Sequence, residues 1–362
     1  TAAVAGEFGL RVITTPHRGL SHARNVGLHA ATGSVVAYLD DDARPDPHWL
    51  LYLGAAFLSS PHAGIGGPNI PPPHDGPIAD CVANAPGGPV HVLLTDREAE
   101  HLPGCNMAFW RPALVAVGGF DPQFRVAGDD VDVCWRMQQA GFTLGFSPAA
   151  MVWHHRRDSV RAYWRQQRGY GKAEALLERK WPQKYTALGH HSWAGRIYGK
   201  GMTRALGWHW SRVYHGVWGM APFQLLYQRQ PNMAGSLPLM PEWYLLVLTL
   251  AAAAVLGLLW QPLLVAWPLL ALAIGATALQ AAVSALHGTF AVLPASRIGR
   301  ARHYALTAWL HILQPCARLR GRLAHGLTPW RRRVDEGLAL PRPRRHRLWD
   351  EAWRGIDERL RR

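Results

Sequence analysis

Two uncharged apolar runs, two thirds of the way along the chain, limit its possible folds more than any other feature. Residues 243–260 carry no charge, Gln261 and Pro262 interrupt the pattern, and residues 263–286 form a second uncharged run. Each run is long enough to cross the roughly 30 Å hydrocarbon layer of a bilayer as a helix. A buried core helix is the alternative reading. Aromatic residues near the ends of both runs favour a transmembrane hairpin over residues 242–287.

The charge of the chain is concentrated after these runs. Residues 297–362 contain 17 Arg and 6 acidic residues, so +11 of the formal net charge of +15 lies there. Such a segment is typical of contact with an anionic membrane surface or with nucleic acid. Because it follows a membrane segment and carries no nucleic-acid recognition motif, we predict an Arg-rich helical tail on the cytoplasmic face and no nucleic-acid partner. The four cysteines lack metal-ligand spacing, which is typical of reduced thiols.

The first 180 residues alternate between strand and helix patterns. Apolar runs predict strands at 10–14, 35–39 and 106–110, and helical spacing predicts helices at 20–31, 47–58, 129–140 and 159–180. This alternation indicates an α/β fold with a doubly wound, mostly parallel sheet. Residues 181–241 are rich in Trp, Tyr, Gly and His, and we expect amphipathic helices that lie against the membrane interface.

A first acidic cluster, Asp40, Asp41 and Asp42, directly follows the apolar run at 35–39. Ligands of open α/β sheets bind at the carboxyl ends of the strands, and carboxylates there can hold Mg²⁺ or Mn²⁺ beside substrate phosphates. The alternative is a solvated turn, since Asp is common in loops.

A second acidic cluster, Asp129, Asp130 and Asp132, lies where a helix is predicted to begin. The helix dipole favours negative charge at that position, so part of the cluster has a structural explanation. Asp132 and Arg136 are four residues apart and can pair along one helix face. Asp129 and Asp130 remain side by side, and neighbouring carboxylates in a cleft can raise one another's pKa, which suits a general base.

Five segments follow one another in a recognisable order. They are GLSHARNVG at 19–27, YLDDD at 38–42, GCNMAF at 104–109, GGFD at 118–121 with DDVDVCWR at 129–136, and VWHH at 152–155. Together they resemble the motifs of family 2 inverting glycosyltransferases, which have the GT-A fold. The resemblance covers residues 10–177 and implies a GT-A domain at 1–180. That domain begins at about the family's second strand, so we expect it to lack the first strand and helix, which hold the base of the nucleotide.

The resemblance also implies roles for individual residues. Asp130 is the base that deprotonates the acceptor hydroxyl, and Asp129 replaces the family's usual Glu. Asp42 ligates Mn²⁺ or Mg²⁺ together with His154, or with His155 as the alternative. The donor side consists of Arg24, Asn25, Asp40 and Asp41. The acceptor side consists of Gly104, Asn106, Gln166 and Gln167, of which the last two lie in a segment that partly resembles the QxxRW motif of processive members.

These roles predict metal-dependent transfer, with inversion, from a UDP-, GDP- or dTDP-linked sugar to a hydroxyl of a lipid-linked or cell-surface polysaccharide acceptor. Arginines flank both apolar runs, at Arg229 and at Arg297, Arg300 and Arg302, which places the catalytic domain and the tail on the cytoplasmic side of a bacterial inner membrane. The alternatives are a non-catalytic membrane scaffold derived from such an enzyme and a two-carboxylate glycoside hydrolase. The acidic triplet after a strand disfavours the hydrolase, and binding of a nucleotide-sugar donor would exclude the scaffold.

Overall fold

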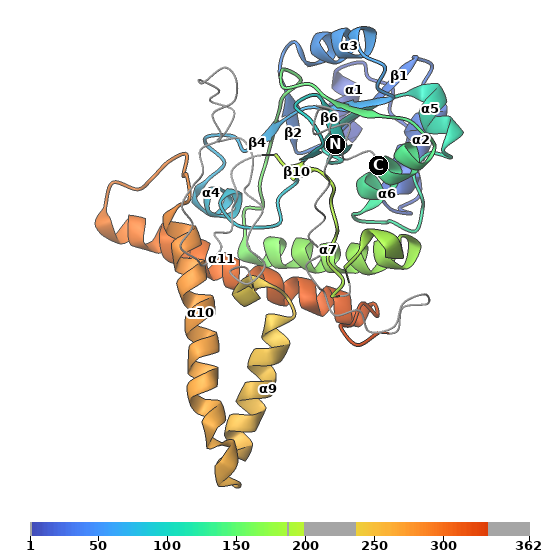
Figure 1. Ribbon diagram of the computed structural model, residues 1–362. Helices are drawn as coiled ribbons and strands as arrows, with labels where there is room; N and C mark the ends of the chain where they lie inside the picture. Colours follow the sequence, from blue (N-terminus) through green and yellow to red (C-terminus); the bar gives the residue numbers. More distant parts are fainter. Residues whose placement is uncertain (1, 187, 199–236, 332–362) are drawn as a thin grey trace, which may run out of the picture.

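The computed structural model describes residues 2–186, 188–198 and 237–331. An α/β domain forms the larger part of the described chain, and two long helices, α7 (Val160–Lys180) and α11 (Arg297–Ala324), run side by side along it (Figure 1). Two further helices, α9 (Trp243–Leu256) and α10 (Ala266–Leu286), form a hairpin that projects away from α7 and α11. The α/β prediction for the first part of the chain is confirmed.

The α/β domain contains two sheets. The larger sheet has the strand order β1-β7-β3-β8-β6-β5-β10, and the smaller one has the order β2-β9-β4. The strands are β1 (Val35–Leu39), β2 (Ala43–Pro45), β3 (Gly64–Gly66), β4 (Asn69–Ile70), β5 (Val92–Leu93), β6 (Glu98–His101), β7 (Asn106–Trp110), β8 (Leu144–Phe146), β9 (Val152–His154) and β10 (Arg196–Ile197). The shorter helices are α1 (Ala2–Glu7), α2 (Leu20–Ala30), α3 (Trp49–Ser59), α4 (Pro77–Ala83), α5 (Arg111–Ala116) and α6 (Asp129–Gln139).

The prediction of a mostly parallel sheet is wrong. Strand β3 pairs in parallel with β8, and β4 with β9, whereas every other pairing among the described strands is antiparallel. Strands β1, β3 and β8 do run in one direction, as strand–helix–strand alternation requires. The antiparallel strand β7 lies between β1 and β3, however, and β6 lies beside β8. The sheet is therefore mixed.

Apolar residues from the sheet and its covering helices form the core of the α/β domain. Leu28 of α2, Phe109 of β7 and Val133 of α6 belong to the largest buried cluster. A second cluster packs Trp49 and Phe57 of α3 against the smaller sheet and β3. Helix α6 thus buries its apolar face in the core, and Asp130 of its acidic first turn contacts Gly104 in the connection between β6 and β7.

Two predicted elements have a different structure. Residues 10–14 form no strand, and Leu10, Val12 and Ile13 are exposed, because no strand of the described chain pairs with them. The segment 181–241 was expected to be helical. Its described residues 181–186 and 188–198 instead contain a 3-10 turn (Pro182–Lys184) and strand β10, which pairs with β5, and a further 3-10 turn spans Leu237–Leu239. Residues 199–236 lie outside the described part.

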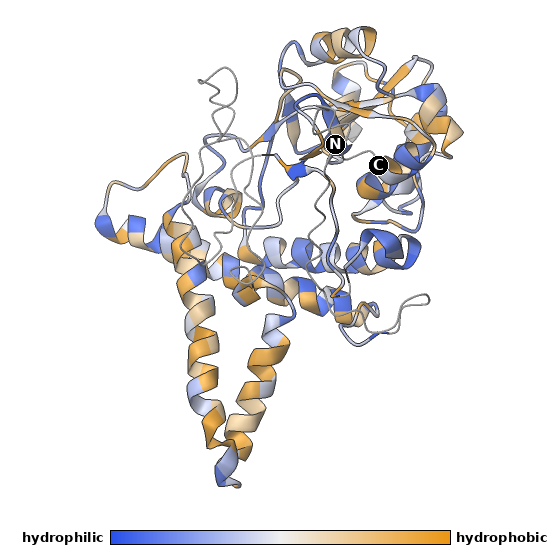
Figure 2. Cartoon of the chain, in the orientation of Figure 1, coloured by the Kyte–Doolittle hydropathy of each residue, from blue (hydrophilic) through white to orange (hydrophobic). Residues whose placement is uncertain are grey.

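The α9–α10 hairpin is apolar along most of its length (Figure 2). The span Gln261–Leu286 is long and apolar enough to cross a membrane. Its most apolar 18 residues have a mean hydropathy of 2.0, and only 17% of them are buried. Helix α9 is shorter, with 14 residues. Large side chains at the hairpin tip are exposed, among them Leu259 and Trp260. A core helix would bury such residues, so the hairpin is not part of the core of the described chain.

Helix α11 links the hairpin to the α/β domain. It packs against α10 and, along much of its length, against α7. Arg322 of α11 is buried, and it contacts Glu174 of α7 and Glu242, which immediately precedes α9. Arg318 also pairs with Glu174. The predicted basic tail is therefore helical over residues 297–324, and its described arginines Arg318, Arg322 and Arg331 bind carboxylates of the protein. Residues 332–362 lie outside the described part.

Candidate active site

Two aspartates and one histidine meet beyond the end of strand β1. Asp40 and Asp42 follow β1 directly, and His154 is the last residue of β9. The antiparallel pairing of β2 with β9 sets Ala43 opposite His154, which brings the histidine beside the aspartates. His154 Nε2 lies 3.2 Å from an Asp42 carboxylate oxygen and 3.9 Å from an Asp40 oxygen. The three residues each offer one ligand atom, and these atoms lie within 4.8 Å of one another.

This donor set fits a divalent cation. Carboxylate oxygens with one imidazole nitrogen suit Mn²⁺, whereas Mg²⁺ prefers oxygen ligands and keeps several waters. The side chains of Asp40 and Asp42 are 35% and 30% exposed, so a cation bound there could also contact a ligand from solvent. The cluster can therefore hold an ion and present it to an anionic substrate.

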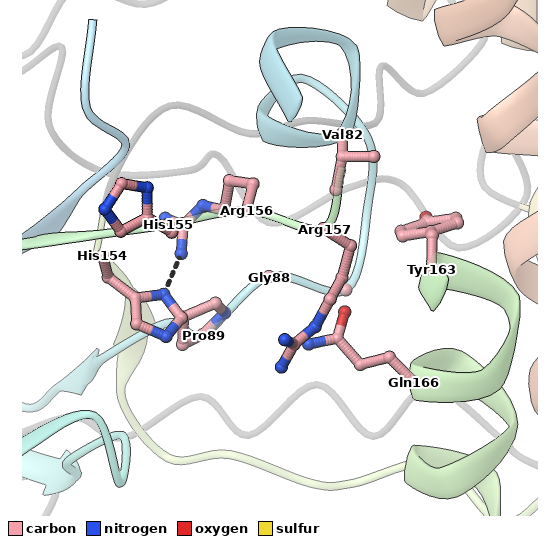
Figure 3. Close-up of a pocket in the computed structure, with 10 residues that line it drawn as sticks. Val82, Gly88, Pro89, His154, His155, Arg156, Arg157, Tyr163 and Gln166 are labelled. Carbon is pink, nitrogen blue, oxygen red and sulfur yellow. Dashed lines mark hydrogen bonds between the residues drawn. The ribbon is translucent and has the colours of Figure 1, made fainter. Parts of the chain in front are cut away.

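The orientation of His154 is fixed by Arg156. The Arg156 Nη1 group lies 2.7 Å from His154 Nδ1, as the dashed line in Figure 3 marks. Because a guanidinium can only donate, Nδ1 accepts and the ring proton sits on Nε2, facing Asp42. The hydrogen bond from His154 outweighs partial burial and, with the charge of Arg157, lowers the pKa of Asp42. Asp42 is thus ionised at neutral pH. A cation bound at Nε2 would put the ring proton on Nδ1, so it would compete with the hydrogen bond that Nδ1 accepts from Arg156.

Arg24 of α2 joins the two acidic clusters. Its guanidinium lies 2.5 Å from Asp129 and 3.3 Å from Asp40, and it donates to the carbonyl of Gly104 at 2.9 Å. The arginine is only 7% exposed. A Cβ at position 104 would lie 2.7 Å from Arg24 Nη2, so the close approach of this backbone requires glycine.

Asp129 and Asp130 have different environments, although they are adjacent at the start of α6. The Asp129 side chain is 2% exposed and is bound by Arg24. The Asp130 side chain is 22% exposed and accepts the N–H of Gly104 at 3.0 Å. Burial acts to raise the pKa of Asp130, but His101, Arg24 and the Gly104 N–H outweigh it and lower the pKa to about 2. Asp130 is the ionised carboxylate of this pair that an external hydroxyl can approach.

A small pocket adjoins the cluster of Asp40, Asp42 and His154. Figure 3 shows its lining, in which Gln166 of α7 and Arg157 point toward one another. Arg157 also lies 3.3 Å from Asp42, so one cationic side chain contacts both the pocket and the cluster. The remaining lining residues are Val82, Gly87, Gly88, Pro89, His154, His155, Arg156 and Tyr163.

Comparison with known proteins gives the same assignment as the motifs. Residues 1–113 match the family described as Glycosyl transferase family 2. The chain carries a family 2 glycosyltransferase domain. The matched range contains the Asp40–Asp42 cluster, Arg24 and Gly104, and it ends before Asp130 and His154.

Several curated proteins are similar to this domain. The pre-mycofactocin glycosyltransferase of Mycobacterium tuberculosis is 33% identical over 198 residues, which is 51% of this chain and 40% of that protein. The glucosyl-dolichyl phosphate glucuronosyltransferase of Haloferax volcanii is 29% identical, over 38% of this chain and 48% of that protein. The chain therefore spans less than half the length of these relatives.

Among solved structures, the chain is similar to the mannosyltransferase PcManGT of Pyrobaculum calidifontis, which was solved with GDP-Man and Mn²⁺. The identity is 22% and the TM-score 0.36, over 51% of this chain and 50% of that one. At this level of similarity nothing about ligands is transferred to the chain.

Several residues that the sequence assigned to substrate contacts have protein partners in the glycosyltransferase domain. The Asn25 side chain makes two hydrogen bonds with the backbone of Phe120. The Asn106 amide donates to the carbonyls of Gly67 and Ala150, and its oxygen accepts from Trp49. These two side chains hold loops together.

Other predicted residues divide between protein contacts and open positions. Gln167 is fully buried and donates to the carbonyl of Gly87, on the loop that lines the pocket. Gln166 lines the pocket itself, and Asp41 is exposed. His155 pairs with Asp75, whereas His154 lies in the cluster with Asp40 and Asp42, so the geometry favours His154 over the alternative ligand.

Sequence reasoning missed four residues that surround the site. Arg156 and Arg157 follow the two histidines, and their position directly after a predicted ligand was the available signal. Asp75 binds His155 and the backbone N–H of Arg156. His101 lies 3.5 Å from Asp130, and no motif or spacing distinguishes it from the other histidines of the sequence.

Proposed function

We propose that this chain transfers a glycosyl group from a nucleotide-sugar donor to an acceptor hydroxyl. One observation carries the proposal. Asp40, Asp42 and His154 form a cluster that can hold a cation, and Arg24 joins this cluster to the start of α6. The ionised carboxylate of Asp130 is partly exposed at that helix start. Glycosyl transfer needs a site for the diphosphate and a base for the hydroxyl, close to one another but separate. The family 2 match and the glycosyltransferase names of the relatives support the same assignment.

Individual side chains have distinct tasks in this reaction. Asp130 takes the hydroxyl proton, and the Gly104 N–H holds its carboxylate in place. Arg24 pairs with the buried Asp129 and with the partly exposed Asp40 and balances their charge. Arg157 pairs with Asp42 and also lines the pocket, where its positive charge favours an anionic substrate group.

Asp40, Asp42 and His154 would hold the cation. A bound Mn²⁺ or Mg²⁺ supplies Lewis-acid stabilisation of the diphosphate leaving group. With one base on the acceptor side, a single displacement accounts for the reaction, and it inverts the anomeric configuration. We therefore propose an inverting hexosyltransferase that uses a UDP-, GDP- or dTDP-linked sugar.

The hairpin suggests where the acceptor lies. Its exposed apolar surface favours insertion into a bilayer, with the α/β domain and α11 on the same side. Nucleotide sugars are used on the cytoplasmic side, and Arg297, Arg300 and Arg302 at the start of α11 fit that side. We propose a lipid-linked or surface polysaccharide acceptor at the bacterial inner membrane. The proposed domains are 1–180, 181–241, 242–287 and 297–362.

The test is release of nucleoside diphosphate by the detergent-solubilised chain with a panel of UDP-, GDP- and dTDP-sugars and Mn²⁺. We expect turnover with at least one donor, its loss with chelator, and its loss in Asp42→Ala. Asp158→Ala, which changes an exposed carboxylate, is the matched control. Calorimetric titration of Mn²⁺ measures the ion site without turnover. If no donor binds, the transferase assignment is refuted and the non-catalytic scaffold stands.

A further inference from the structure

His101, the last residue of β6, has one ring nitrogen fixed and one without a hydrogen-bond partner. Its Nδ1 lies 3.0 Å from the carbonyl oxygen of Val90. Because a carbonyl only accepts, Nδ1 carries the proton, and Nε2 of the neutral ring has a free lone pair. Nε2 is buried and has no hydrogen-bond partner among the described residues. A buried ring nitrogen without a hydrogen-bond partner lowers the free energy of unfolding, so its presence calls for an explanation.

The free nitrogen faces Asp130. Nε2 lies 3.5 Å from the Asp130 Oδ2 atom, and the His101 side chain is 8% exposed. This distance is slightly longer than a hydrogen bond, as catalytic contacts often are before substrate binds. When Asp130 is ionised and His101 neutral, two lone pairs face one another. The pair is therefore arranged to take up one proton between the two groups.

The other groups around His101 do not compete for that proton. The Trp193 ring covers His101, with ring centroids 5.5 Å apart, and shields it from solvent. His91 and His191 are the other titratable rings near it. Burial lowers the pKa of His91 to about 3 and that of His191 to about 4, so both are neutral near pH 7. The charge of Arg24 also acts on Asp130, but a guanidinium cannot accept a proton.

We propose that His101 is the positioning residue that receives, through Asp130, the proton of the acceptor hydroxyl; this rests on the proposed function of Asp130. As the acceptor oxygen bonds to the anomeric carbon, its O–H bond breaks and the proton passes to Asp130. The bond from the anomeric carbon to the diphosphate breaks with its electron pair on the diphosphate. The proton then moves from Asp130 to His101 Nε2, which leaves an imidazolium beside an ionised carboxylate. It returns to water after product release.

The chemistry explains why a second group is useful. The Gly104 N–H and the charge of Arg24 both favour the ionised form of Asp130, so this carboxylate holds a transferred proton poorly. An imidazole is ordinarily the stronger base, so it provides a favourable destination for the proton. The Val90 carbonyl keeps Nε2 directed at Asp130 while the Nδ1 proton stays in place.

The first experiment follows the His101 Cε1–H resonance by NMR during a pH titration of the histidine-labelled full chain in detergent. The resonance is assigned by its loss in His101→Asn, in which the amide can still donate to Val90. In Asp130→Asn we expect the titration midpoint to move to lower pH, by at least about half a unit, because the imidazolium loses its carboxylate partner. In Asp158→Asn it stays in place. An unchanged midpoint in Asp130→Asn overturns the proposal.

The second experiment uses turnover with the donor found by the panel above. His101→Asn and His101→Gln each keep one of the two polar positions of the ring, but neither accepts a proton. We expect both variants to lower kcat by at least about tenfold and to leave the KM for donor unchanged. The change of kcat with pH that depends on His101 should also disappear. Rescue of wild-type kcat by either variant overturns the proposal. Absence of turnover in the wild-type chain refutes the transferase function and the relay's role in it, while the NMR titration still decides whether His101 and Asp130 share a proton.

Discussion

Arg322 and Glu174 form a buried ion pair between α11 and α7, with the Arg322 Nε atom 2.5 Å from the Glu174 carboxylate. Both side chains are less than 5% exposed. Removing one partner of a buried pair costs about 3–5 kcal/mol, because the other charge stays buried and unpaired. We expect Arg322→Met and Glu174→Gln each to lower Tm in detergent by about 6 °C or more.

Arg320 provides the matched control, since it is exposed on the same helix. Arg320→Gln should change the stability by no more than about 0.5 kcal/mol. Equal effects of Arg320→Gln and Arg322→Met would contradict a structural role of the ion pair.

The same pair predicts a pH dependence of stability. Burial acts to raise the pKa of Glu174, but the charges of Arg322 and Arg318 outweigh it and lower the pKa well below its ordinary value. A depressed carboxylate pKa contributes stability above the unfolded value of 4.5, and this contribution is lost as the pH falls further. Tm should therefore fall between about pH 5 and pH 3 in the wild-type chain, and less steeply in Glu174→Gln. Parallel Tm profiles would show that other groups dominate.

The neighbouring histidines test the metal site. His154 lies in the cluster with Asp40 and Asp42, whereas His155 pairs with Asp75. We expect His154→Ala to weaken Mn²⁺ binding at least about tenfold in calorimetric titration, because a ligand is lost. His155→Ala should keep the affinity within about twofold. If the two effects are reversed, the alternative ligand is the correct one.

The neighbouring aspartates separate chemistry from structure. Asp130→Asn should lower kcat at least about a hundredfold and leave the affinity for donor unchanged, because only the proton acceptor is lost. Asp129→Asn leaves Arg24 buried without its closest carboxylate, so it should lower Tm as well as activity. Kinetics and thermal unfolding of the same samples distinguish the two. A crippling Asp129→Asn with normal Tm, beside an active Asp130→Asn, would assign the base to Asp129.

The hairpin orientation can be tested by labelling single cysteines with an impermeant reagent in intact cells. Ser159 and Ser296 look suitable by sequence, but both side chains cap helices and should be kept. Asp158→Cys and Ala295→Cys lie beside them at exposed positions, and Leu259→Cys lies at the hairpin tip. We expect labelling at 259 only. Labelling at 158 or 295 would reverse the proposed orientation.

Local patterns in the sequence predicted most helices and two neighbouring strands, β1 and β7. The apolar run 35–39 and the helical spacing after residues 20 and 129 give β1, α2 and α6. Pairing directions were not predictable, because β7 enters the sheet between β1 and β3 through contacts far apart in the chain. Strand β3 has the sequence Gly-Ile-Gly, in which two of the three residues disfavour strands. It forms because both of its edges are paired.

The candidate site was predictable only as far as its motifs extend. Asp40, Asp42 and His154 were found by resemblance, and the β2–β9 pairing brings them together. The binding of backbone groups by Asn25 and Asn106 was not predictable, because their partners lie in distant segments of the chain. His101 carries no pattern at all. Its importance follows from one carbonyl and one carboxylate on either side of its ring.

The contact of Arg322 with both Glu174 and Glu242 has a consequence for substrate choice. Helix α7 carries Gln166 of the pocket, and Glu242 immediately precedes the hairpin. When the hairpin is in a bilayer, these contacts set the height of the pocket above the lipid headgroups. The proposed lipid-linked acceptor must then reach that height with its hydroxyl while its lipid stays in the membrane. The length of the acceptor headgroup thereby becomes a selection criterion, independent of the shape of the pocket.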